Sequence, residues 1–182
     1  YGATQALGMY NADLDEDGAV GWLAGFAYQI PEIALKTSIT YRSEIDHKAS
    51  AREYGQSNVL AFVGSSPVYD VATDANITTP QSVNLDFQTG IMANTVAFAN
   101  VRWVNWKDFS LDLKQFGTVA DTLGALGQTP DNPNGFDIVG YTDDQWSANV
   151  GVGRKFNDLW AGNVSVGWDS GAGNPVTTLG PT

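Results

Sequence analysis

Acidic side chains at regular spacing are the first residues in this sequence that could do chemistry. Asp13, Asp15 and Asp17 stand in the pattern D-x-D-x-D-G at residues 13–18, which resembles the start of a calcium-binding loop. Such a loop needs a bidentate glutamate at its last position, and Ala24 stands there instead. A weak calcium loop and a solvated surface loop both remain open, and no other metal or cofactor is expected.

Residues that an enzyme would need are scarce. The only histidine is His47, so a Ser-His-Asp triad would have to use it together with Asp46. No serine stands in a G-x-S-x-G motif, and no G-x-x-x-x-G-K phosphate loop occurs. Cysteine is absent, which excludes a cysteine nucleophile and a thiolate metal site. The sequence therefore predicts that the protein is not an enzyme and that His47 is a surface residue.

The composition predicts a folded, acidic protein. Of the 182 residues 43% are hydrophobic, which is too many for a disordered chain. The formal net charge of -11 predicts that the protein does not bind nucleic acid. No run of about 18 apolar residues occurs, so a transmembrane helix is not expected, although shorter alternating segments can cross a membrane as strands.

A period of two in the apolar residues predicts six long strands. Val83, Leu85 and Phe87, for example, share one face and alternate with polar residues on the other. The six predicted strands lie near residues 20–30, 33–47, 81–90, 95–112, 145–156 and 159–169. The apolar residues change parity after Trp103, which predicts a β-bulge at that position.

The predicted connections alternate between short and long. Short turns near residues 31–32, 90–94 and 157–158 form three hairpins, and long loops at residues 48–79 and 113–143 join the hairpins. A short helix is allowed at residues 118–126, and residues 1–18 are predicted to be a loop. In an up-and-down meander all short turns then lie at one end, which is typical of an outer-membrane barrel. We therefore predict an all-β fold, an antiparallel up-and-down transmembrane β-barrel, with a soluble β-sandwich as the alternative.

Several stretches resemble the FadL family of outer-membrane transporters for long-chain fatty acids and other hydrophobic compounds. The matching motifs are V-G-W at 20–22, T-Y-R-S-E at 40–44, P-Q-S-V-N-L-D-F at 80–87, V-R-W-V-N-W-K-D-F at 101–109, and S-V-G-W-D-S at 165–170 followed by N-P-V at 174–176. The family's barrel has fourteen strands, so the resemblance implies that residues 1–182 are an internal slice of the barrel, without the family's hatch. It also implies a place in the bacterial outer membrane, among outer-membrane lipid and lipopolysaccharide.

The resemblance implies passive passage of a hydrophobic ligand through a plugged barrel. The expected ligand is a long-chain fatty acid or an aromatic hydrocarbon. Lys36, Arg42 and Arg102 are the candidates for binding a carboxylate head group, since they lie on the polar face of their strands. The alternative for each is an internal salt bridge with a carboxylate at position 44, 46 or 86.

Two further groups of candidate residues follow from the resemblance. Asp169 falls where the family keeps an acidic residue in its interior pocket. The apolar residues Val59, Leu60, Phe62 and Val63 belong either to an outer groove that captures the ligand or to the buried core of a loop. A general porin or a structural surface protein remains the alternative function, since a water-filled pore would need a charged lumen and no plug.

Overall fold

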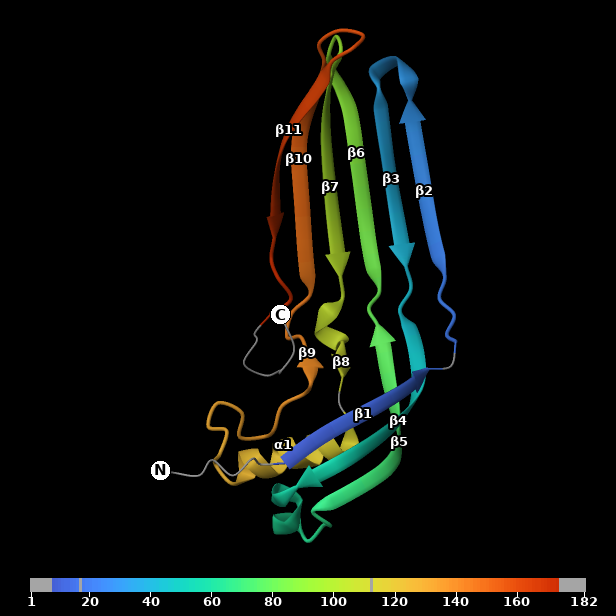
Figure 1. The fold of residues 1–182 in the computed structure, drawn as a ribbon. Helices are drawn as coiled ribbons and strands as arrows, with labels where there is room; N and C mark the ends of the chain where they lie inside the picture. Colours follow the sequence, from blue (N-terminus) through green and yellow to red (C-terminus); the bar gives the residue numbers. More distant parts are fainter. Residues whose placement is uncertain (1–7, 17, 112, 174–182) are drawn as a thin grey trace.

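In the residues that the structure describes, the chain is all-β with one α-helix. The computed structural model describes residues 8–16, 18–111 and 113–173 and places most of them in two antiparallel sheets (Figure 1). No helix in these described ranges is long and apolar enough to cross a membrane.

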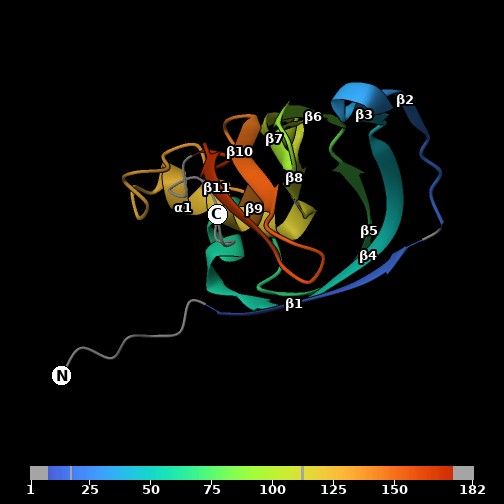
Figure 2. The ribbon, with the colours of Figure 1, turned by 90° about the horizontal axis from the view of Figure 1, so that it is seen from above.

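The larger sheet has six antiparallel strands in the order β11-β10-β7-β6-β3-β2. Their bounds are β2 Leu23–Ile30, β3 Leu35–Arg42, β6 Ser82–Met92, β7 Thr95–Val104, β10 Gln145–Lys155 and β11 Ala161–Asp169. All six predicted strands are therefore present, but those predicted at 33–47 and 95–112 are seven and eight residues shorter, and the one predicted at 81–90 is one residue longer. The strands follow a gentle arc when seen along their axes, and the sheet is not closed into a barrel (Figure 2). The outer edges of β2 and β11 carry no further strand in the described part of the chain.

The three short turns lie together at one end of the six-stranded sheet, as the sequence predicted (Figure 1). The first is a 3-10 turn, η1 (Pro31–Ile33). It begins at Pro31, whose ring fixes φ near the value that such a turn needs. Asn94 takes a positive φ of 57° in the turn between β6 and β7, a conformation that asparagine tolerates better than most residues. The third turn joins β10 to β11, where the Asn157 side-chain oxygen accepts hydrogen bonds from the main-chain N–H groups of Leu159 and Trp160.

Residues 48–79, predicted to be a long loop, form a hairpin of two strands instead. β4 (Ile45–Ser57) and β5 (Val68–Thr79) pair along their whole length and are joined by the 3-10 segment η2 (Asn58–Val63). The prediction failed because the inward positions of β4 are occupied by small or polar residues, among them Ala49, Ala51 and Glu53. The alternation is present, but hydrophobicity alone does not reveal it.

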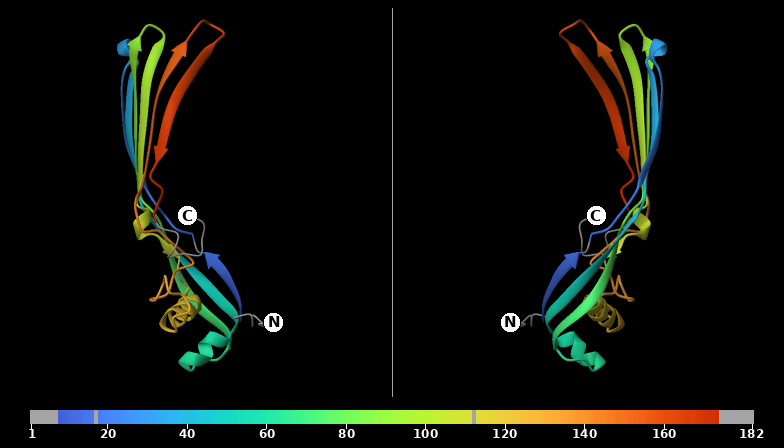
Figure 3. Two further views of the ribbon diagram at one scale, coloured as in Figure 1. Left: turned by 90° about the vertical axis from the view of Figure 1, so that its left-hand side faces the viewer. Right: turned by 90° about the vertical axis from the view of Figure 1, so that its right-hand side faces the viewer.

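Residues 8–16, predicted to be part of a loop, form a third strand beside this hairpin. β1 (Gly8–Glu16) pairs antiparallel with β4, and together β1, β4 and β5 make a three-stranded sheet that we call the arm. The pairing of β3 with β6 and that of β4 with β5 keep one register across the breaks at residues 43–44 and 80–81. The arm is thus a continuation of the larger sheet, and it leans away from the axis of that sheet (Figure 3).

A single helix covers one face of the arm (Figure 3). Helix α1 (Lys114–Ala125) lies in the segment predicted as the loop 113–143, and it begins four residues before the short helix that the sequence allowed. The same segment holds β9 (Val139–Gly140), which pairs with β8 (Ser110–Leu111), a two-residue strand at the end of the predicted strand 95–112. Position 124 in α1 needs a glycine, because the Cβ of any other residue would come only 2.6 Å from the carbonyl oxygen of Pro133.

Glu53 joins the helix to the arm. Its side chain is 0% exposed, and its carboxylate accepts hydrogen bonds from the hydroxyls of Tyr10 and Thr73. It also accepts hydrogen bonds from the main-chain N–H groups of Gln115 and Phe116. These N–H groups belong to the first turn of α1, which has no capping side chain of its own. The Glu53 carboxylate from β4 therefore caps the N-terminus of α1, and its negative charge is favourable at the positive end of the helix dipole.

The predicted bulge at Trp103 is absent. β7 stays in register with β10 from Thr95 to Val104 and then ends. A 3-10 turn, η3 (Trp106–Asp108), follows and moves the side chain of Trp106 out of the strand alternation. The register irregularity of the sheet lies instead between Gly90 and Met92 in β6.

Candidate ligand-binding face of the six-stranded sheet

The six-stranded sheet has one apolar face and one polar face, and the register aligns each across all six strands. On the apolar face, for example, Ile39, Leu85 and Val101 are direct neighbours on three successive strands. Large apolar side chains on this face stay exposed, among them Phe26 at 67%, Val150 at 61% and Val166 at 71%. Such an extended apolar surface is unusual for a protein surrounded by water.

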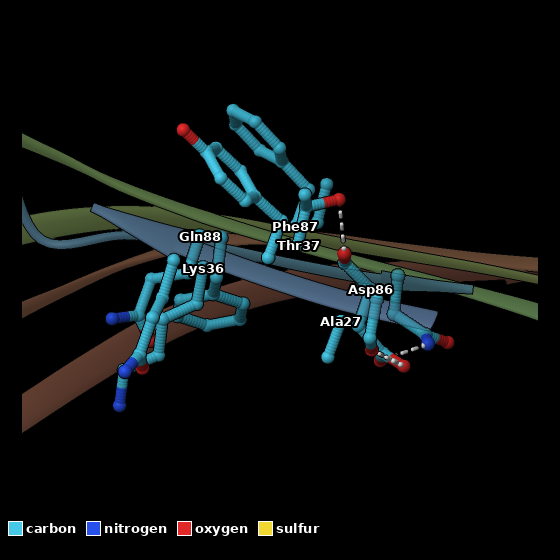
Figure 4. A pocket seen from close by; sticks show the side chains of 12 residues that line it. Ala27, Lys36, Thr37, Asp86, Phe87 and Gln88 are labelled. Carbon is cyan, nitrogen blue, oxygen red and sulfur yellow. Dashed lines mark hydrogen bonds between the residues drawn. The ribbon is translucent and has the colours of Figure 1, made fainter. Parts of the chain in front are cut away.

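The polar face contains a cleft of about 770 Å³, which lies near the turn end of β2 and β3 and near the middle of β6 and β7. Lys36 and Gln88 are paired across β3 and β6, and both lie on the same side of the sheet (Figure 4). Asp86 lies on this side too, while Phe87 points to the apolar side (Figure 4). The cleft thus combines one cation with amide groups and an acid.

Neighbouring side chains hold the Asp86 carboxylate in place. It accepts a hydrogen bond of 2.6 Å from the Asn100 side chain and one of 3.3 Å from the Ser38 hydroxyl. Lys36 makes no ion pair with Asp86 or with any other residue in the described ranges. The internal salt bridge that was the alternative for Lys36 is therefore absent, and its ammonium group is free to meet a ligand.

An aromatic ring interrupts the polar face beside this cleft. Phe98 of β7 lines the cleft and lies opposite Gly151 of β10 in the register. A Cβ on Gly151 would collide with the Phe98 ring and come 2.7 Å from Cβ of Ser165. The glycine therefore creates the space that the ring occupies.

Replacing Gly151 by alanine should displace the Phe98 ring and lower the free energy of unfolding by about 1–2 kcal/mol, as overpacking does in tightly packed sites. Chemical denaturation of both proteins measures the difference. Gly153→Ala is the control on the same strand, because a Cβ there meets nothing closer than 3.6 Å. Equal stability of the two variants would contradict the tight fit at Gly151.

The other predicted site residues lie outside the cleft, nearer the arm. Arg102 is followed across the sheet by Ser147 and then Asp169, so two strand spacings, roughly 10 Å, separate the arginine from the acid. Arg42 and Arg102 make no ion pair in the described part of the chain. Asp169 accepts hydrogen bonds from the Gln145 side chain and from the N–H of Gly171. The four predicted polar residues therefore share one face but not one pocket.

A chain of hydrogen bonds crosses the sheet where the six strands meet the arm, and the sequence did not predict it. The Tyr41 hydroxyl donates to Gln81, whose amide donates to Asn105. The amide of Asn105 and the indole N–H of Trp103 then donate to Asp144, both at 2.9 Å. The clue in the sequence is the cluster of amide-bearing and acidic residues directly beside the predicted strand ends.

Because Asp144 accepts two of these hydrogen bonds, the free energy of unfolding of the protein should depend on pH. Partial burial alone would raise the pKa of Asp144, but the hydrogen bonds from Asn105 and Trp103 and the charge of Lys107 lower it below its usual value. A carboxyl group whose folded pKa is lowered stabilises the protein above its unfolded pKa of about 3.9. That contribution is lost as the pH falls through the folded pKa.

We therefore expect Asp144→Asn to cost about 1–2 kcal/mol of unfolding free energy at pH 7, and progressively less as the pH falls below about 4. Denaturation curves that follow tryptophan fluorescence, recorded from pH 7 down to pH 2, measure the difference. A difference that stays constant over this range would contradict a charged role for Asp144.

The predicted loop residues lie in the arm. Leu60 and Val59 are 1% and 3% exposed and belong to the packed interior, whereas Val63 is 50% exposed. The side chain of Phe62 lies outside the described part of the structure. The alternatives for this segment were a groove that captures the ligand and a buried core, and Val59 and Leu60 lie in a buried core.

The acidic run does not form the tight loop that a calcium site needs. Asp13 and Asp15 lie in the extended strand β1, opposite Arg52 and Ser50 of β4. Asp17 lies outside the described residues. No cluster of three acidic, histidine or cysteine side chains suited to a metal ion occurs in the described ranges. His47, predicted at the surface, is half-buried in β4.

No protein-family profile matches the chain, and no curated protein is significantly similar to it.

Proposed function

We propose that the chain forms part of an outer-membrane β-barrel through which long-chain fatty acids or other hydrophobic compounds pass. The observation that carries this proposal is the apolar face of the six-stranded sheet, which is continuous over all six strands and exposed in the described structure. Lipid is the environment in which such a face is stable, provided that every backbone group is paired.

The dimensions of the strands support this proposal. The six strands are 8–11 residues long, close to the 9–11 residues with which a tilted strand crosses a bilayer. The open edges of β2 and β11 would need further strands, because an unpaired edge is not stable in lipid. The proposal therefore requires strands that complete the wall on both sides.

Aromatic side chains gather at the end of the sheet that adjoins the arm. The rings of Trp22 and Tyr41 lie 4.9 Å apart, and those of Trp103 and Trp146 lie 6.4 Å apart. Trp and Tyr are enriched where a membrane meets water, since their rings are apolar and their N–H and O–H groups are polar. In the proposed orientation this row marks one membrane surface, and the arm projects beyond it.

The cleft on the polar face would face the lumen and meet the ligand. A fatty acid needs an apolar surface for its chain and a cation for its carboxylate, and Phe98 and Lys36 line the same cleft. No covalent chemistry is needed for passage.

An uptake experiment tests the proposal. Cells that lack their own fatty-acid transporter would express the whole gene that contains this chain, and labelled oleate, toluene and a small sugar would be offered separately. Uptake of oleate or toluene without leakage of the sugar is the expected result. Sugar leakage without uptake of either hydrophobic compound would overturn the proposal.

Lys36→Gln should slow oleate uptake about fivefold and leave toluene uptake unchanged, because only the carboxylate of oleate needs a cation. Lys48→Gln is the control, since Lys48 is an exposed lysine of β4 in the arm, outside the cleft. Equal loss of uptake for oleate and toluene would show that Lys36 does not recognise the head group.

A general porin is the second candidate function. The observation that favours it is that Lys36, Arg42 and Arg102 share the polar face and make no ion pairs within the described ranges, as charged residues lining a water-filled pore would. Leakage of the sugar in the uptake experiment would select this function.

A further inference from the structure

One charged side chain stands on the apolar face of the six-stranded sheet. Arg154 of β10 has the same strand parity as Val150 and Val152, and in the register it lies between Thr95 of β7 and Gly162 of β11. All other residues that the six strands place on this face in the described ranges are uncharged. A charge on a lipid-facing surface is costly unless the side chain reaches the head groups, so the place of Arg154 along the strand matters.

The guanidinium group of Arg154 is not neutralised by the chain itself. The residue is exposed and makes no ion pair in the described part of the chain. The next residue, Lys155, has the opposite parity and is paired with Asp158 at 2.7 Å. Acidic residues outnumber basic ones by 20 to 9 in this sequence, yet no described acid pairs with Arg154. Its charge is therefore available to an anion from outside the chain.

Two aromatic side chains accompany Arg154 at the tip of the β10–β11 hairpin. The main-chain N–H of Phe156 donates to the carbonyl of Trp160 at 2.9 Å, and the two residues are 66% and 69% exposed. A Cβ on Gly162 would come 3.3 Å from the Phe156 ring, so this ring lies beside the residue that is paired with Arg154. Such exposed rings are typical of the level at which a membrane meets water.

Arg154 lies at the border of the apolar face opposite to the aromatic row beside the arm. Trp146 belongs to that row and stands on the same strand, near its other end. The stretch from Trp146 to Arg154 has about nine residues, with which a tilted strand crosses a bilayer. If the row marks one membrane surface, Arg154 lies at the other, where the phosphate groups of the lipids are.

The chemistry of the arginine fits that anion. A guanidinium group presents its N–H donors in a planar fork that matches the oxygens of a phosphate. The rings of Phe156 and Trp160 offer apolar surface to the glycerol and the first methylene groups of a lipid. We propose that Arg154 binds the phosphate of an anionic phospholipid in the leaflet at the turn end of the sheet. This inference rests on the proposed function, because it requires that the apolar face meets lipid.

Trp160 gives a probe at the site itself. The whole protein that contains this chain would be labelled with fluorotryptophan, held in uncharged detergent micelles and titrated with phosphatidylglycerol. The fluorine signal of Trp160 is identified by its loss in Trp160→Phe, and that of Trp22, at the arm end of the sheet, by its loss in Trp22→Phe. We expect a saturable shift of the Trp160 signal and no shift of the Trp22 signal.

Matched variants test the contact. Arg154→Gln should weaken the binding of phosphatidylglycerol about fivefold, as loss of one basic side chain at a membrane surface does. Lys155→Gln is the control, because it removes the same charge one position further along, from a lysine that is paired with Asp158. It should leave the binding unchanged. Phosphatidylcholine, which has no net charge, and inorganic phosphate, which has no acyl chains, should both bind more weakly than phosphatidylglycerol.

Four outcomes would overturn the proposal. These are no saturable shift of Trp160, equal shifts with phosphatidylcholine or inorganic phosphate, binding that Arg154→Gln leaves unchanged, and an equal loss in Lys155→Gln. Assembly in the outer membrane tests the lipid contact separately. A protein that does not enter membranes contradicts the proposed function as well, whereas a membrane-embedded protein whose Trp160 signal ignores phosphatidylglycerol contradicts only the role of Arg154.

Discussion

Replacing Glu53 by alanine should release helix α1 from the arm and lower the free energy of opening this helix by about 3 kcal/mol. The carboxylate is fully buried and receives hydrogen bonds from two hydroxyl groups and from the N–H groups of Gln115 and Phe116. Without it, the buried donors lose a charged acceptor, and bonds to charged groups are the stronger ones. Hydrogen exchange of the α1 amides, followed by mass spectrometry, measures the change.

Arg52→Ala is the matched control for this experiment. Arg52 precedes Glu53 on β4 but points to solvent, where it makes two hydrogen bonds to Asp70 at 2.7 and 2.6 Å. An exposed ion pair contributes little, so the α1 amides should exchange as in the unmodified protein. If both variants exchange alike, Glu53 does not anchor the helix.

Val150→Arg should reduce the amount of protein assembled in outer membranes more than tenfold. Val150 lies at the middle of β10 on the apolar face and is 61% exposed. An arginine on the lipid side of a barrel costs about 2–4 kcal/mol near the bilayer midplane. Protein that resists extraction from isolated outer membranes by urea is the quantity to measure.

Asn149→Arg provides the control with the same new side chain one position away. Asn149 lies on the polar face, opposite Asn100 of β7. If the apolar face meets lipid, this variant assembles normally because its arginine reaches the lumen. If the two variants assemble equally well, the apolar face does not contact lipid. That result would also contradict the proposed function.

The sequence predicted the six-stranded sheet because its strands alternate strongly between apolar and polar residues. The turns were predictable as well, since Pro31 and the pair Asn157–Asp158 interrupt that pattern. The arm was missed because the inward residues of β4 are alanines and a glutamate. In β5 the inward series Tyr69, Val71, Thr73, Ala75, Ile77 alternates clearly and could have revealed the strand.

The sequence predicted which polar residues share one face of the sheet, but not how these residues are arranged relative to one another. Strand parity places Lys36, Arg42, Arg102 and Asp169 on one face. It does not give the register between strands, which brings Lys36 beside Gln88 and leaves Asp169 near the strand ends. The role of Glu53 needed the fold, because the helix that it caps lies more than 60 residues further along the chain.

The single register that runs from the larger sheet into the arm restricts how this protein can change length during evolution. Because successive side chains alternate between faces, one inserted residue near Ser43 would turn Glu53 away from α1 and bring Arg52 inward. A matching insertion in the partner strand near Gln81 would restore pairing but not this orientation. The arm can therefore lengthen or shorten only in steps of two residues on each strand, and related proteins should differ there by even numbers.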